Sequence, residues 1–274
     1  MNRSGVRSAW LLVLFSALSA LGGFEDNESS VRAEGMAGAF TAVADDIGAL
    51  DFNPGGLYQV ETRQFQGFYK LLFGGVGVGL HTMQLGLGMA LPKLGTIGVR
   101  VQETGFELQS QRSLKFGHGF RLAEGLGVGY GLNGYNLSQG ELGQAFGFGI
   151  DLGMFCRIYR YWTAGFYAHN LNMPRIAGSD LPRLLVFGLG FSPNPGIHSA
   201  VDVSKEPGKR TRVAVGPELR IIQDHLTLRA GVQTEPVRLA AGLRAGLSRL
   251  ALDYSVQTHP VMPLTHNFGL AVQF

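Results

Sequence analysis

From about residue 62 to its end, the chain alternates between apolar side chains and glycine or charge, with a period of two. In one such run Phe146, Phe148 and Ile150 share one face, while glycines and an aspartate share the other. This period is typical of β-strands whose two faces meet different surroundings. Turn residues, as at positions 92–95 and 193–196, separate successive runs.

Counting these runs predicts an all-β fold of about fourteen strands. They lie near residues 62–72, 78–91, 95–104, 111–122, 125–137, 144–156, 160–169, 183–192, 197–205, 210–222, 225–233, 236–244, 247–257 and 265–274. An even number of alternating strands with short turns is typical of a transmembrane antiparallel β-barrel, in which each strand satisfies its backbone on its neighbours. A water-soluble β-sandwich or lipocalin-like barrel is the alternative, because alternation does not say which face lies inside.

Three features favour the membrane barrel. The chain is 45% hydrophobic and only 16% charged, a low share for a surface in water. Residues 1–23 read as a secretory signal, with Arg3 and Arg7 before an apolar run at residues 9–18. That run is too short to span a bilayer. Cleavage after Ser19 or Gly22 fits, and we take residues 1–22 as the signal peptide.

The third feature is the final strand. Phe268, Leu270, Val272 and the terminal Phe274 lie on one face of an alternating run. A terminal aromatic residue in this setting resembles the signal that the outer-membrane assembly machinery reads. The barrel assembly machinery and outer-membrane lipid are therefore expected partners. Four aromatic residues further suit an interfacial girdle: Tyr159, Tyr161, Trp162 and Tyr167.

Residues 32–57 differ from the rest of the chain, since they are short, apolar and rich in small residues. Met36, Phe40 and Val43 are spaced as on one face of a two-turn helix. Asp45 or Asp46 can cap a second short helix through residues 47–50.

Asn53 then ends that second helix and can cap the turn that begins at Pro54. Such an element is too small to fold alone, so we expect it to plug the barrel. The domains are then the signal peptide, a leader and plug over residues 23–60, and a barrel over residues 61–274.

The run GMAGAFTAVADDIGALDFNPGGL resembles the N-terminal hatch of the FadL-like outer-membrane family, whose Asn-Pro-small signature is matched by Asn53, Pro54 and Gly55. It is more similar still to the PorV/PorQ branch, which shares the small-residue run and the paired acids Asp45 and Asp46. The final THNFGLAVQF is similar to the same branch. The resemblance implies a fourteen-stranded barrel in the outer membrane of a Gram-negative-type cell.

Charged residues fall on the glycine-bearing face of the strands. A charge facing lipid costs roughly 2–4 kcal/mol near the midplane, so these residues are expected to line the lumen. They are Arg100, Arg121, Asp151, Asp202, Arg212, Glu218, Arg220, Arg229, Arg238 and Asp253. They could form a cation-lined path or a clamp for a carboxylate. They could also form an ion-pair lattice that anchors the hatch, with Asp45 or Asp46 meeting an arginine, which is the interpretation we favour.

Other chemistry finds little support in the sequence. The single cysteine, Cys156, excludes an intrachain disulfide framework. The seven histidines are not at metal-ligand spacing with an acid or cysteine, and Ser255 and His259 lack an orienting third group, so neither a metal nor an enzyme is indicated. Without the signal peptide the chain has 21 basic and 20 acidic residues, a net charge of +1. Such a balance does not indicate a nucleic-acid-binding protein.

Two functions are consistent with these observations. The first is passive passage of a small hydrophobic compound across the outer membrane, which the resemblance to transporters implies, with a site between the outer loops and the hatch. Asn53, Pro54 and Gly55 would be the hinge of the hatch. The second is a non-transport scaffold that holds a protein of a type IX-like secretion or surface-attachment system. The loops are short for a large capture site or a cargo dock.

Overall fold

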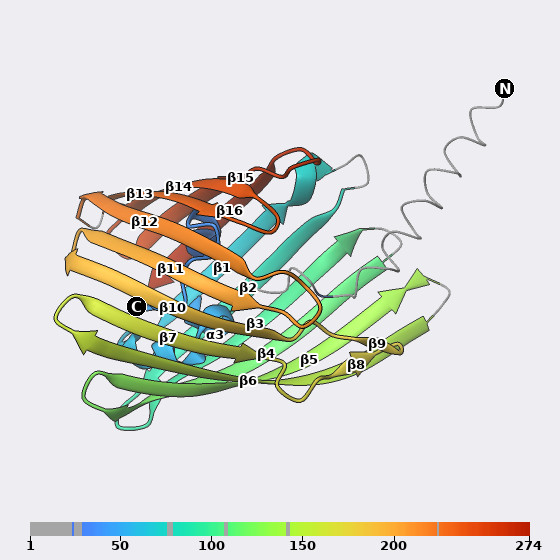
Figure 1. The fold of residues 1–274 in the computed structure, drawn as a ribbon, viewed down its shortest axis with the longest axis horizontal. Coiled ribbons are helices and arrows are strands. Elements are labelled where there is room, and N and C mark those ends of the chain that lie inside the picture. The colour runs from blue at the N-terminus through green and yellow to red at the C-terminus, as the bar shows by residue number, and fades with distance from the viewer. Residues whose placement is uncertain (1–23, 25–28, 76–78, 107–108, 141–142, 224) are drawn as a thin grey trace.

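The structure, a computed structural model, describes residues 24, 29–75, 79–106, 109–140, 143–223 and 225–274. The predicted signal peptide lies outside the described residues. Fourteen of the described strands form one closed antiparallel barrel (Figure 1). These are β1 (Gln64–Leu71), β2 (His81–Leu91), β3 (Gly95–Phe106), β4 (Gln109–Ala123), β5 (Leu126–Gln139), β6 (Gly143–Tyr159), β7 (Trp162–His169), β10 (Leu184–Asn194), β11 (Ile197–Lys205), β12 (Arg212–Ile222), β13 (Leu226–Gln233), β14 (Arg238–Leu247), β15 (Leu250–Gln257) and β16 (Thr265–Gln273).

Each strand pairs with its neighbours in sequence, and β1 pairs with β16 to close the barrel. Strands β7 and β10 pair across an insert that contains a small hairpin, β8 (Arg175–Ile176) and β9 (Ser179–Asp180). We call the end where β1 begins and β16 ends the proximal end, and the opposite end the distal end. The fourteen predicted strands are confirmed, with boundaries that differ by at most three residues, whereas the β8–β9 hairpin was not predicted.

The outer wall of the barrel is apolar and its inner wall is polar or glycine. On β6, Phe146 is 73% exposed and Phe148 is 53% exposed, whereas Asp151 is fully buried. The same alternation runs along β2, where Leu85 and Leu87 face outward and Gln84 faces inward. An exposed apolar wall of this kind is unfavourable in water but favourable against the acyl chains of a bilayer. The structure therefore has the orientation that a membrane barrel requires.

Residues 29–60 lie inside the barrel, toward the proximal end (Figure 1). We call these residues the hatch. It contains α2 (Val31–Gly35), α3 (Ala49–Phe52) and the 3₁₀ helix η1 (Pro54–Gln59). Another 3₁₀ turn, η2 (Leu72–Gly75), lies between β1 and β2. No helix in the described part of the chain is long and apolar enough to cross a bilayer.

The helix expected from the spacing of Met36, Phe40 and Val43 is wrong. The chain turns there instead, because Ala37 and Gly38 both adopt positive φ angles, of 53° and 83°. The three apolar residues are buried, but the barrel encloses the hatch on all sides, so their spacing does not mark one face of a helix. The helix in this region is α2, five residues earlier.

The other two local predictions have different outcomes. The Asp46 carboxylate accepts a hydrogen bond from the Gly48 amide (2.8 Å) in the turn before α3, but α3 begins at Ala49 and has no side-chain cap, so the predicted cap of that helix is wrong. Asn53 caps η1, since its side-chain oxygen accepts from the Gly55 amide (3.1 Å). That cap is confirmed.

Glycines in the wall let the hatch backbone approach closely. A Cβ placed on Gly216 of β12 would lie 2.6 Å from both Cβ and the carbonyl oxygen of Met36. On the hatch side, a Cβ on Gly55 would lie 2.8 Å from the backbone of Met154 in β6. These distances leave no room for a side chain, so hatch and wall fit together backbone to backbone.

Candidate functional site

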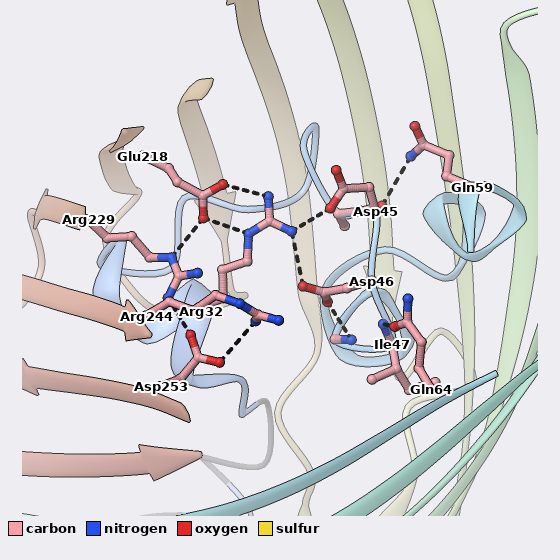
Figure 2. Close-up of polar contacts among 12 residues, drawn as sticks. Arg32, Asp45, Asp46, Ile47, Gln59, Gln64, Glu218, Arg229, Arg244 and Asp253 are labelled. Atoms are coloured by element: carbon pink, nitrogen blue, oxygen red, sulfur yellow. Dashed lines mark hydrogen bonds and ion pairs between the residues drawn. The ribbon is translucent and has the colours of Figure 1, made fainter. Parts of the chain in front are cut away.

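The candidate site is the polar network that joins the hatch to the barrel wall. Its centre is Arg32 of α2, whose guanidinium binds the Glu218 carboxylate of β12 through two hydrogen bonds of 2.8 and 3.0 Å. The same guanidinium donates to Asp45 and to Asp46, at 3.0 Å from the latter. One hatch arginine thus joins two hatch acids to the wall (Figure 2).

The charge of Arg32 is secured by these neighbours. Burial lowers the pKa of its guanidinium, but the carboxylates of Asp45, Glu218 and Asp46 raise it by more, so that the pKa stands well above its ordinary value. Asp45 is the most open of the acids, with a side chain 38% exposed. Arg32 therefore remains a cation at every pH at which the barrel is expected to work.

The network continues around the wall through three neighbouring strands. Arg229 of β13 donates to Glu218 (2.7 Å) and to Asp253 of β15 (2.7 Å), and Arg244 of β14 donates to the second oxygen of Asp253 (3.0 Å). The carboxylates of Glu218 and Asp253 thus each bridge two arginines (Figure 2). We call these seven residues the Arg32 network.

A second cluster holds α3. The Asp51 carboxylate pairs with Arg100 of β3 (2.7 Å) and lies 3.6 Å from the ammonium of Lys115 on β4. Lys115 also pairs with Asp151 of β6 (2.7 Å). All four side chains are buried, and their charges alternate from hatch to wall. A buried charge of this kind is tolerated because it is paired.

Asp151 collects further donors from β7 and the segment after it. The Tyr167 hydroxyl donates to one of its oxygens (3.0 Å), while the Asn170 amide donates to the other (3.0 Å) and the His169 ring nitrogen lies 2.9 Å from that same oxygen. The Tyr135 hydroxyl in turn donates to the Asn170 side chain (3.0 Å). We call the following residues the Asp51 network: Asp51, Arg100, Lys115, Tyr135, Asp151, Tyr167, His169 and Asn170.

Hatch groups outside these two networks also bond to the wall. Asp202 of β11 accepts from the amides of Phe40 (3.0 Å) and Thr41 (2.9 Å). Lys70 of β1 pairs with Glu34 of α2 (2.8 Å). The hatch is thus fixed along its whole length.

The residues proposed as a hinge are fixed as well. The Asn53 side-chain amide donates to the carbonyls of Thr41 (2.8 Å) and Met154 (2.9 Å), and so joins two parts of the hatch to β6. Pro54 and Gly55 follow it in η1 and are buried.

The predicted lumen residues occupy three kinds of position. Six are buried inside the barrel: Arg100, Asp151, Asp202, Glu218, Arg229 and Asp253. Arg212, Arg220 and Arg238 are partly exposed, at the ends of their strands. Arg121 is exposed at the proximal rim, near Tyr58 of η1. Burial raises the pKa of the Tyr58 hydroxyl, and the cations Arg157 and Arg121 lower it by less, so that the pKa is above its ordinary value.

Asp45 and Asp46 both meet an arginine, as expected, and that arginine is Arg32 of the hatch. One interpretation needs correction. Tyr167 is not part of an outer girdle, since it is buried in the lumen, whereas Tyr159, Tyr161 and Trp162 are exposed.

Sequence reasoning also missed Arg32, Asp51 and His169 as site residues. Strand parity could have found His169 and placed Tyr167, because both share a face with the inward Gly165. The only sequence signal for Arg32 is that it is a charged residue in a short segment rich in small, apolar residues. In the described part of the chain, no group of three or more His, Cys, Asp or Glu residues could hold a metal ion.

Toward the distal end, an apolar cluster lies inside the barrel among other inward residues that are polar. Phe24 packs edge-on against Tyr135, with ring centroids 4.9 Å apart. Leu137 of β5 and, from the insert between β7 and β10, Ile176 and Leu181 complete this buried cluster. We call it the distal apolar cluster.

The fold can be compared with known structures on this basis. The toluene transporter TbuX of Ralstonia pickettii matches over 92% of this chain and 100% of its own, with 13% identity and a TM-score of 0.68. The CymD monoaromatic hydrocarbon channel matches over 92% and 99%, with 12% identity and a TM-score of 0.67. A Pseudomonas aeruginosa FadL homologue matches over 90% and 98%, with 13% identity and a TM-score of 0.62.

The fold is that of the FadL-like outer-membrane barrels. No protein-family model and no curated protein matches the sequence. At these identities, the FadL-like likeness establishes the architecture of the barrel.

Proposed function

We propose that this protein is an outer-membrane barrel that admits a small hydrophobic compound by passive diffusion. The observation that carries the proposal is the distal apolar cluster, which lies inside the mouth of a barrel that shares its fold with TbuX, a toluene transporter, and CymD, a monoaromatic hydrocarbon channel. Binding sites for apolar solutes are lined mainly by aromatic and aliphatic side chains of the kind that meet in this cluster.

The outer-membrane setting is supported by the apolar outer wall and the FadL-like fold. Barrels of this kind have short periplasmic turns and longer extracellular loops. The proximal end carries the short turns between β2 and β3, β4 and β5, and β14 and β15, so it faces the periplasm in this proposal. The distal apolar cluster then faces the outside.

Passage requires the hatch to move, because it fills the lumen. The Arg32 network and the Asp51 network would act as two latches. Asn53 donates to the wall at Met154, so residues 53–55 suit a pivot that stays attached while the rest of the hatch swings away.

The same contacts favour a second candidate, a scaffold of the PorV/PorQ type that transports nothing. Arginine–acid pairs occupy the centre of the lumen, and the hatch interlocks with wall glycines such as Gly216. A permanently closed barrel that presents a protein-binding surface would show these features.

Uptake of toluene distinguishes the two candidates. We would measure it in vesicles whose outer leaflet is lipopolysaccharide, since that leaflet slows apolar solutes, and compare the intact barrel, a deletion of residues 29–60 and the variant Arg112→Gln. Arg112 forms an exposed pair with Glu103, so its loss leaves the hatch untouched.

Passage gated by the hatch predicts that the intact barrel and Arg112→Gln take up toluene faster than empty vesicles do. It also predicts that uptake is faster still when residues 29–60 are deleted. Toluene uptake no faster than in empty vesicles for all three proteins would instead support the scaffold.

A further inference from the structure

A polar cavity of about 480 Å³ opens at the proximal end, directly beside the Arg32 network. Its wall includes Arg220 of β12, Thr227 of β13 and Arg244 of β14. His225 and Arg249, from the two turns that border it, also line it. Of these five residues only Arg244 belongs to the Arg32 network, and the proposed passage gives no role to the other four.

The strand register brings the three wall residues into one row. Arg220 is the partner of Thr227 across β12 and β13, and Thr227 is the partner of Arg244 across β13 and β14. Neighbouring strands lie about 4.8 Å apart, so the two arginines flank the threonine hydroxyl at a span that one small ligand can bridge.

The cations of this cavity exceed its carboxylates. Among the described residues, Asp45 and Asp46 pair with Arg32, and Glu218 and Asp253 are each shared by two arginines.

In that same part of the chain, neither Arg220 nor Arg249 forms an ion pair. Arg244 spends one nitrogen on Asp253, which leaves donors free, because a guanidinium carries five N–H groups. The cavity thus holds unneutralised positive charge.

We infer that this cavity binds a phosphate-type anion between Arg220 and Arg244, with the Thr227 hydroxyl as a third donor. Guanidinium groups recognise phosphate through paired hydrogen bonds, and a tetrahedral anion can accept from three sides at once. The anion could be free phosphate or the phosphodiester of a lipid headgroup, since the cavity opens at the rim of the barrel.

The test is binding to the purified barrel, which does not depend on whether the barrel transports anything. Inorganic phosphate would be titrated by calorimetry at constant ionic strength. Retention of phosphatidylglycerol would be read by native mass spectrometry after release from phosphatidylcholine nanodiscs doped with that lipid.

Arg220→Gln is the main variant, because it breaks no ion pair among the described residues. Arg212→Gln is the matched control, since it is an inward arginine on the same strand but at the distal end, bonded to Ser204 (3.0 Å). Thr227→Val tests the third donor without a change of charge.

We expect Arg220→Gln to weaken binding about tenfold or more, as loss of a charged hydrogen bond does, and Thr227→Val to weaken it less. Arg212→Gln should bind as the natural protein does. If the barrel binds phosphate but does not retain phosphatidylglycerol, the ligand of the cavity is a soluble anion. If it retains phosphatidylglycerol, the ligand is a lipid headgroup. Binding of neither, or an equal loss in Arg212→Gln, would overturn the inference.

Discussion

Arg32 shows how one residue can hold a buried segment in place. Its guanidinium meets Glu218 with two parallel hydrogen bonds and still has donors for Asp45 and Asp46. A lysine would bring the same charge and three donors, but it lacks the planar pair of N–H groups that meets one carboxylate through two parallel hydrogen bonds. The geometry of the group, more than its charge, suits it to this position.

Replacing Arg32 by Gln should therefore destabilise the barrel by about 3–5 kcal/mol, because three carboxylates lose a buried partner. Arg32→Lys should fall between the natural protein and Arg32→Gln. The measurement is the free energy of unfolding in denaturant with the barrel in detergent. The exposed pair of Arg112 and Glu103 gives the control, and Arg112→Gln should cost about 1 kcal/mol or less. Equal losses in Arg32→Gln and Arg112→Gln would contradict a structural role for the network.

Tyr167 tests the Asp51 network in the same way. Its hydroxyl donates to Asp151 and lies 3.2 Å from the Lys115 ammonium, so Tyr167→Phe leaves both buried groups short of a partner. We expect a loss of about 1–3 kcal/mol in the free energy of unfolding. Tyr130→Phe, on the outer wall, should change it by about 0.5 kcal/mol or less. If the two variants lose the same amount, the lumen hydroxyl contributes nothing specific.

At the scale of the element, strands and hatch differ in how far the sequence determines them. A strand such as β6 has one face toward apolar surroundings and one toward the lumen, and this difference is written into its residues with a period of two. The hatch is buried on all sides, so Met36, Phe40 and Val43 would be apolar in any conformation. Only local chemistry remained informative there, which is why the Asn53 cap could be predicted and the helix could not.

The candidate site shows the same limit. Inward charges such as Glu218 and Arg229 follow from strand parity, but which of them pair depends on the register between strands and on where the hatch lies. The partner of Asp45 comes from within the hatch, thirteen residues earlier, and no period in the sequence indicates it.

Gly216 gives a prediction about the contact between these two elements. Gly216→Ala would place a methyl group 2.6 Å from Met36, too close for any real contact, so the hatch must shift away from β12. We expect a cost of about 1–3 kcal/mol and faster protease cleavage within residues 29–60. Gly67→Ala on β1 is the control, because its nearest neighbour would be 3.7 Å away. Cleavage at the same rate in both variants would mean that the hatch does not depend on this close fit.

The lumen of the whole molecule combines two kinds of contact. Ion pairs and close glycine contacts hold the hatch, while toward the distal end a cluster of aromatic and aliphatic side chains lies beside polar residues of the wall. In the proposed passage, an apolar solute from the distal end would meet the distal apolar cluster before it meets the Arg32 network.

The apolar outer wall requires lipid around it, and Leu87 tests that requirement directly. Leu87 lies near the middle of β2 and is 59% exposed, while Leu94, in the turn after β2, is 64% exposed. In a bilayer, Leu87→Arg should cost about 2–4 kcal/mol and Leu94→Arg about 1 kcal/mol or less, because the penalty falls toward the interface. In water the two exposed positions would be equivalent and both changes nearly neutral. Unfolding free energies measured in phospholipid vesicles decide between these outcomes, and equal values for the two variants would place the outer wall outside the membrane.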